Sequence, residues 1–124
     1  MPTLPPLPLK VLTDGLKPYL PKGWLIEGSA RPVDNVPTTV VKLQQLAVRK
    51  LTAAPLGTLE IDMRATITAP GEHTQTVENK LDRDLLLFLN ALNTHRVKWD
   101  EATKVIADSR LGYDITITIL ALKE

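Results

Sequence analysis

The chain has 124 residues, with 15 Lys and Arg against 14 Asp and Glu, and it contains no cysteine. A chain of this length builds one hydrophobic core, so we expect a single domain over residues 1–124. The net charge of +1 creates no large field that would draw the protein onto nucleic acid or an anionic membrane. The lack of cysteine excludes disulfides, thiolate metal ligands and Cys nucleophiles, and it is typical of a protein made in a reducing cytoplasm.

The segment Met1–Pro8 is rich in proline and has no basic residue ahead of its apolar ones. We therefore expect an extended arm rather than a signal helix. Apolar residues then recur on one helical face over Leu9–Tyr19, and the last proline of the arm suits the first helical position. Gly15 and Pro18 predict a short helix, ended by Pro18 or Pro21.

The middle of the chain is predicted to form strands. Trp24–Ile26 is a candidate for a brief strand, and Gly28–Pro37 carries the turn formers of an ordered loop. The apolar residues of Thr38–Arg49 fall on both parities, which predicts a strand covered on both faces. Thr58–Thr68 alternates strictly, which predicts a strand with one buried and one charged face. The buried face would consist of Leu59, Ile61, Met63, Ala65 and Ile67.

Thr76–Asn93 is predicted to be an amphipathic helix capped by Thr76. Its apolar stripe consists of Val77, Leu81, Leu85, Phe88, Leu89 and Leu92. A closing ribbon follows, with a Trp-bearing strand at Val97–Trp99, the run Glu101–Val105, a turn, and the alternating strand Leu111–Ile119.

These elements predict an α+β fold, in which an antiparallel or mixed sheet of about four to five strands carries the long helix on one face. The predicted fold also includes a short N-terminal helix. We expect the stripe of the long helix to pack on the apolar faces of the two alternating strands. The sheet would supply Leu59, Ile61, Met63, Ile115, Ile117 and Ile119.

The residues that could carry catalysis or bind a metal do not form a recognisable motif. His73 and His95 have no second ligand at metal spacing. Ser29 and Ser109 do not lie in a nucleophile elbow, and there is no glycine-rich phosphate loop. We therefore expect no enzyme activity, no metal and no cofactor.

Charged residues on the two amphipathic elements have an ordinary explanation. Glu60, Asp62 and Arg64 share one strand face, and they could be arranged as an acid pair with an electrophile. The preferred interpretation is a solvated or subunit-facing sheet surface. The charged residues of Lys80–Asp84 are interpreted as the solvent-exposed side of the long helix.

Other features indicate assembly. The predicted hairpin tip Lys50–Gly57 exposes apolar side chains that a soluble monomer would be expected to avoid, and open sheet edges require a partner or protection. The candidate interface residues are Leu51, Ala53, Ala54, Pro55, Leu56, Arg31, Asp34, Asn35, Glu60, Asp62 and Arg64.

The order of these segments from Leu9 to Leu122 is distinctive. A helix is followed by Pro-Lys-Gly-Trp and a brief strand, a Pro-bearing loop, two long strands around an Ala-Pro-Leu-Gly tip, and an amphipathic helix. Trp99, the Glu101–Val105 run and the strand around Tyr113–Thr116 complete the order. This order resembles the tail terminator proteins of long-tailed bacteriophages of the siphovirus type, those of actinobacteriophages in particular.

The resemblance implies a structural protein of the virion without catalysis. Such a protein forms a hexameric ring on the head-proximal end of the tail tube, stops tube polymerisation and provides the head–tail joining surface. The implied partners are further copies of this chain, the major tail tube protein and a head completion or connector protein. DNA would pass through the lumen without specific binding, no membrane would be involved, and assembly would take place in the cytoplasm of the bacterial host.

Two other classes stay open at this point. One is another head–tail connector, neck or tail-tube protein, which would share the ring-forming α+β design. The other is a small α+β ligand-binding domain or enzyme, which would need a deep polar pocket between helix and sheet.

Overall fold

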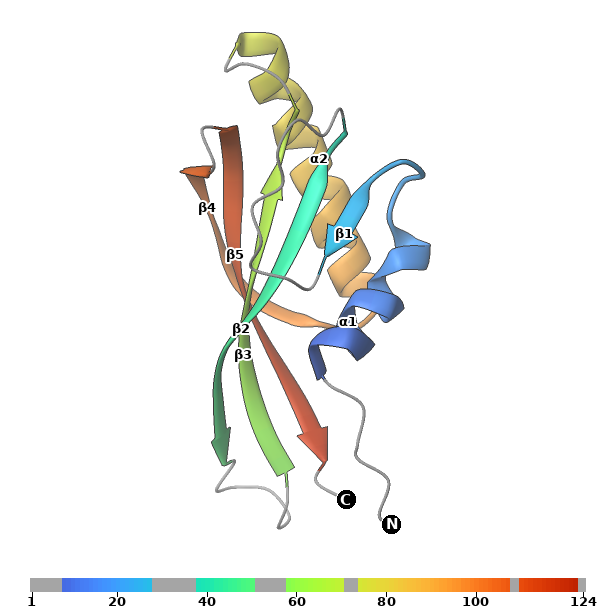
Figure 1. The fold of residues 1–124 in the computed structure, drawn as a ribbon, viewed down its shortest axis with the longest axis vertical. Coiled ribbons are helices and arrows are strands. Elements are labelled where there is room, and N and C mark those ends of the chain that lie inside the picture. The colour runs from blue at the N-terminus through green and yellow to red at the C-terminus, as the bar shows by residue number, and fades with distance from the viewer. Residues whose placement is uncertain (1–7, 28–37, 51–57, 71–73, 108–109, 123–124) are drawn as a thin grey trace.

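The computed structural model describes residues 8–27, 38–50, 58–70, 74–107 and 110–122. The described residues form a five-stranded sheet, a long helix and a short N-terminal helix. Both helices lie on the same side of the sheet (Figure 1). The predicted α+β class is therefore confirmed.

The sheet has the strand order β1-β2-β3-β5-β4. Its central strands are β3 (Thr58–Thr68) and β5 (Arg110–Leu122), which pair antiparallel along their whole length. On one side β3 pairs antiparallel with β2 (Val40–Lys50), and β2 pairs parallel with the brief β1 (Leu25–Glu27). On the other side β5 pairs antiparallel with β4 (Lys98–Ala107). The sheet is therefore mixed, with β1 and β4 at its edges.

The long helix α2 spans Gln75–Thr94. Its N-cap is Thr74, whose hydroxyl accepts a hydrogen bond from the Val77 amide at 3.2 Å. The predicted cap at Thr76 is wrong by two residues, because Thr76 already lies inside the first turn.

The apolar stripe of α2 faces the sheet as predicted. Its buried members are Leu81, Leu85, Phe88 and Leu92. They share one core with Ile61, Met63, Ile115 and Ile117 from the inner face of the sheet. Each such large side chain contributes about 1.5 to 3 kcal/mol on burial, so this layer is the main source of stability.

The N-terminal helix α1 spans Pro8–Leu16, and a 3-10 turn at Lys17–Tyr19 follows it. Pro8 is its first residue, as the sequence predicts. Gly15 has a specific role, because a Cβ there would lie 2.5 Å from Nε2 of His95. The glycine that weakens the helix therefore lets α1 approach the C-terminal end of α2.

Strand β2 corrects one expectation. Its first part is covered on both faces, since Val40, Val41 and Leu43 are buried, but Leu46 and Val48 are each 49% exposed. A bulge between Gln45 and Ala47 shifts the register there. The end of β2, the start of β3 and the end of β5 pair with one another and extend beyond both helices in Figure 1.

The Trp-bearing strand and the Glu101–Val105 run are predicted as separate pieces but form a single strand, β4. A bulge between Trp99 and Ala102 explains the break in the apolar pattern.

Candidate interaction surface

The outer face of the sheet, opposite the helices, carries the polar positions of the strands. Glu60, Asp62 and Arg64 lie side by side on this face of β3, as their alternation predicts. The register places Arg49 of β2 opposite Glu60 and Thr116 of β5 opposite Arg64. No helix of the described residues covers this face (Figure 1).

Arg49 forms ion pairs with two carboxylates of this face, those of Glu60 and Asp62. Arg49 contacts Glu60 Oε1 at 2.8 Å and Asp62 Oδ2 at 2.6 Å. The hydrogen bonds to Glu60 and then Asp62 raise the pKa of the Arg49 guanidinium above its ordinary value. Arg64 donates to Gln44 Oε1 at 3.0 Å. Arg64 therefore pairs with Gln44 across the strands, and the two carboxylates pair with Arg49 instead.

The other candidate interface residues lie outside the described residues. They are Leu51, Ala53, Ala54, Pro55 and Leu56 of the predicted tip, and Arg31, Asp34 and Asn35 of the predicted loop.

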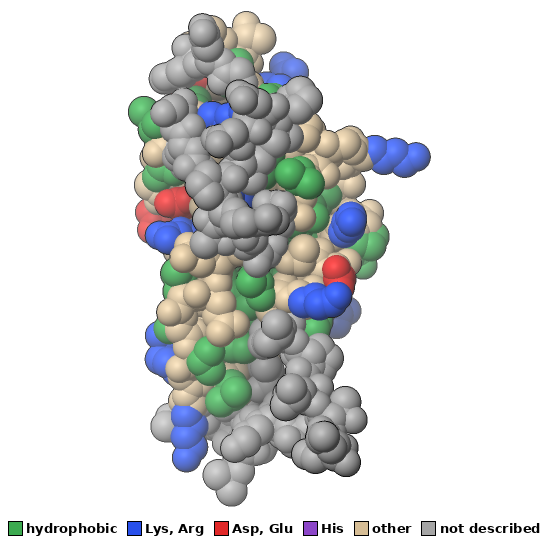
Figure 2. Space-filling view, in the orientation of Figure 1, with side chains coloured by type: hydrophobic (Ala, Val, Ile, Leu, Met, Phe, Trp, Pro, Cys, Tyr) green, Lys and Arg blue, Asp and Glu red, His purple; other side chains and the backbone are tan. Residues whose placement is uncertain are grey.

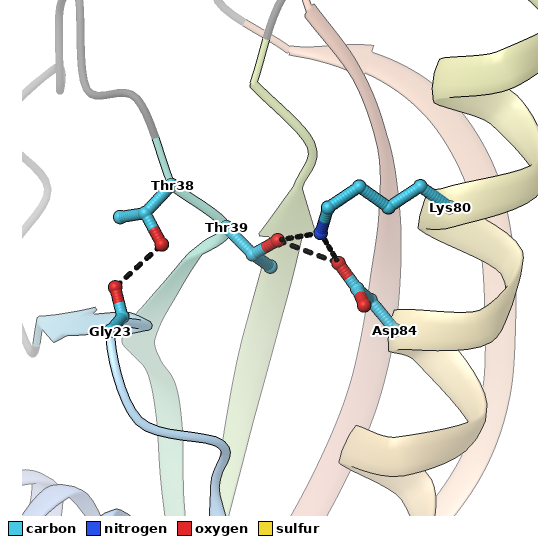
Figure 3. A network of polar contacts seen from close by, with 5 residues as sticks. All are labelled: Gly23, Thr38, Thr39, Lys80 and Asp84. Atoms are coloured by element: carbon cyan, nitrogen blue, oxygen red, sulfur yellow. Dashed lines mark hydrogen bonds and ion pairs between the residues drawn. The ribbon is translucent and has the colours of Figure 1, made fainter.

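A buried polar cluster joins the start of β2 to α2 (Figure 3). Thr39 Oγ1 donates to Asp84 Oδ2 at 2.6 Å, and Lys80 Nζ lies 2.7 Å from the same Asp84 oxygen and 3.1 Å from Thr39 Oγ1. Thr38 Oγ1 donates to the carbonyl of Gly23 beside it. Thr39 is only 1% exposed, so no substrate reaches its hydroxyl, and the cluster fastens the helix to the sheet.

The expectation that Asp84 lies on the solvent side of the helix is wrong, because Asp84 is buried. The spacing of Asp84 from the apolar residues of the helix could have predicted its burial. Asp84 follows Leu81 by three residues and precedes Phe88 by four, which places it on the apolar stripe rather than opposite it.

A second polar cluster joins α2 to the closing hairpin. Tyr113 donates to Asp82 Oδ1 at 2.8 Å, and Lys104 Nζ lies 2.7 Å from Glu78 and 3.3 Å from Asp82. The bond from Tyr113 is the main reason that the pKa of Asp82 is lowered. Burial, and then the bond to Asp82, raise the pKa of the Tyr113 phenol. Glu78 is the main reason that the pKa of Lys104 is raised.

Exposed apolar side chains are dispersed over several elements. In the sheet these are Leu46, Val48, Ile106 and Leu120, and on the helices and the 3-10 turn they are Val11, Tyr19, Leu86 and Leu87. On the described part of the face in Figure 2, Lys and Arg side chains lie apart from one another rather than in one basic patch.

Within the described ranges, no three His, Cys, Asp or Glu residues could together hold a metal ion. Every buried side-chain nitrogen or oxygen there has a hydrogen-bond partner. None of the described helices is long and apolar enough to span a membrane. Trp99 packs against the core and donates from Nε1 to Asn93 at 3.0 Å.

No protein-family model and no curated protein matches the chain. Among solved structures, the chain is similar to a sheath/tube terminator of PVC, an extracellular contractile injection system, determined by cryo-EM in its extended state. The identity is 14% and the TM-score is 0.45, over 90% of this chain. The chain spans 54% of the length of that protein.

Proposed function

We propose that the protein is a structural subunit that terminates the tail tube of a long-tailed bacteriophage. In this proposal, copies of the chain form a closed ring, six to a ring in the family that the sequence resembles. The ring sits on the head-proximal end of the tube, blocks further addition of tube subunits and forms the surface that joins the filled head.

The observation that carries the proposal is the order of the elements. The helix, the brief strand, two long paired strands, the amphipathic helix and the closing hairpin occur in the order on which the resemblance to tail terminators rests. The one-sided coverage of the sheet also supports it. In the described residues one face of the sheet has no helix on it and both edges have open strands, so the sheet has surface to offer to other protein subunits.

The alternative of an enzyme or ligand-binding domain has less support. Such a site needs convergent polar groups in a concavity, whereas the polar groups that the helix and sheet bring together in the described residues are mutually paired. A different connector or tube subunit has the same physical support as a terminator, and the position of the ring in the particle distinguishes them.

The proposal is tested by light scattering from the polymerising tail tube protein of the same virus. Adding this protein should stop the growth of the tubes at a substoichiometric ratio, because one ring blocks one tube end. A matched control is the same protein after thermal unfolding, which should leave growth unchanged. If the folded protein instead adds uniformly along the tubes, it is a tube subunit and not a terminator.

A further inference from the structure

We propose that copies of this chain join through the open edge of β2, from Leu43 to Lys50, and the open edge of β4 of the next copy. The inference rests on the proposed ring and names the two surfaces that build it.

The first observation is that, among the described residues, the two edges have no strand partner over most of their length. β1 pairs with β2 only at Val40, Val41 and Lys42. Beyond Lys42, β3 is the only strand of the described residues beside β2, and β5 is the only one beside β4. Both edges therefore present backbone N–H and C=O groups, which favour pairing with another strand.

The second observation is strand direction. β2 runs antiparallel to β3, β3 to β5, and β5 to β4, so β4 runs antiparallel to β2. A rotation about an axis along the strands keeps these directions. The β4 strand of one copy therefore meets the β2 strand of the next as an antiparallel pair, which forms an ordinary hydrogen-bonded ladder.

The third observation concerns the side chains at the edges. Leu46 on β2 is 49% exposed and Ile106 on β4 is 73% exposed, and pairing would bury both. Lys50 at the end of β2 is exposed, as are Asp100 and Glu101 in the bulge of β4, and none of the three has an ion-pair partner within the described residues. In the antiparallel arrangement the acidic bulge can lie beside the basic end.

Two features restrict the pairing to a matched partner. β1 occupies the first part of the β2 edge, so the incoming strand must be offset toward Lys50. A closed sheet requires a stagger of this kind, called shear, between the hydrogen-bond registers of neighbouring strands. Each edge also carries a bulge, which twists it away from unrelated strands. Because the two edges differ, their contact is head-to-tail, and it closes into a ring when the rotation allows.

The test uses the absence of cysteine from the chain, which makes introduced cysteines unique. The full-length double variant Leu46→Cys with Ile106→Cys is treated with a short bis-maleimide. We expect a ladder of cross-linked species that ends at the ring size. Each single variant should give no cross-linked dimer, because the head-to-tail contact pairs unlike edges.

The matched control is Leu46→Cys with Leu86→Cys. Leu86 is 67% exposed, so a cysteine there is accessible to the reagent, as it is at position 106, but it lies on the helix α2 rather than on a strand edge. This control should give no ladder. Circular dichroism and melting curves verify that the variants fold, as expected for exposed positions.

The outcomes separate this inference from the proposed function. If native mass spectrometry finds rings but positions 46 and 106 do not cross-link, the edges are not the interface, while the terminator proposal stands. A cross-linked dimer from the single Leu46→Cys variant indicates two like edges in contact and overturns the head-to-tail arrangement. A protein that stays monomeric even with tail tubes, and does not cross-link, contradicts both proposals.

Discussion

Thr39, immediately before β2, and Asp84 in the middle of α2 are joined by a buried hydrogen bond of 2.6 Å. The two residues are 45 positions apart in the chain, so the bond fixes where the long helix sits on the sheet. Lys80 neutralises the carboxylate from the solvent side, since its side chain is 51% exposed. The arrangement compensates the cost of burying Asp84.

Replacing Thr39 with Val should lower the free energy of unfolding by about 1 to 3 kcal/mol, because a buried carboxylate oxygen loses a donor. Chemical denaturation measures the change. Thr103→Val on the exposed face of β4 is the matched control, and it should stay within about 0.5 kcal/mol of the wild type. Equal stabilities for the two variants would mean that the Thr39 bond adds nothing.

Phe88 is completely buried between α2 and the sheet. Phe88→Ala should cost about 3 to 5 kcal/mol through lost transfer free energy and the cavity left behind. Leu86→Ala on the same helix is the control, because Leu86 is largely exposed. A Phe88→Ala variant that melts like the wild type would contradict the packing of the helix on the sheet.

The bond from Tyr113 to Asp82 predicts a pH dependence. The pKa of Asp82 is lowered in the folded state, so its stabilising contribution is present above the ordinary Asp pKa of about 3.9 and is lost as pH falls through the lowered value. Tyr113→Phe removes the donor. The variant should be less stable than the wild type at neutral pH, and the difference should shrink below about pH 4.

Denaturation curves between neutral and strongly acidic pH measure that difference. Tyr19→Phe serves as the control, because Tyr19 packs against the ring of His95 and has no hydrogen bond to a carboxylate among the described residues. Its difference from the wild type should not vary over the acid range. A Tyr113→Phe difference that is constant with pH would exclude the coupling to Asp82.

The proposed ring should not bind DNA tightly. With a net charge of +1 each subunit can neutralise few phosphates. A gel-shift titration with duplex DNA at about 0.15 M salt should therefore give at most weak, sequence-independent binding, on the order of 10⁻⁴ to 10⁻⁶ M or weaker. Nanomolar, salt-resistant binding by a monomer would favour a nucleic-acid-binding module instead.

The sequence predicts the fold well where the apolar pattern is regular. The alternation of Thr58–Thr68 places Ile61, Met63, Ala65 and Ile67 in the core, and the stripe from Leu81 to Leu92 faces the same core, as expected. Leu59 is the exception, because it is only partly buried and lies outside the core cluster. Prediction is weaker where one residue departs from its pattern. The bulge at Trp99 and Ala102 breaks the alternation of β4, and Asp84 is a carboxylate at an apolar position whose partner Thr39 is distant in sequence.

The candidate surface was only partly predictable. The alternation places Glu60, Asp62 and Arg64 on one face, but the partner of both carboxylates, Arg49, depends on the register of β2 after its bulge. The open edge of β2 also depends on strand order, because β1 is short and pairs with β2 at three positions, which leaves the rest of β2 without a second strand partner in the described residues. The apolar periodicity of one strand does not indicate which strands lie beside it or in which register they pair.

The proposed function is tested most directly by electron microscopy of virus particles in which this protein carries a gold label. The account predicts label at one point in each particle, where the tail tube meets the head. Label distributed along the tube, at the distal tip, or absent from particles that are otherwise complete would contradict it.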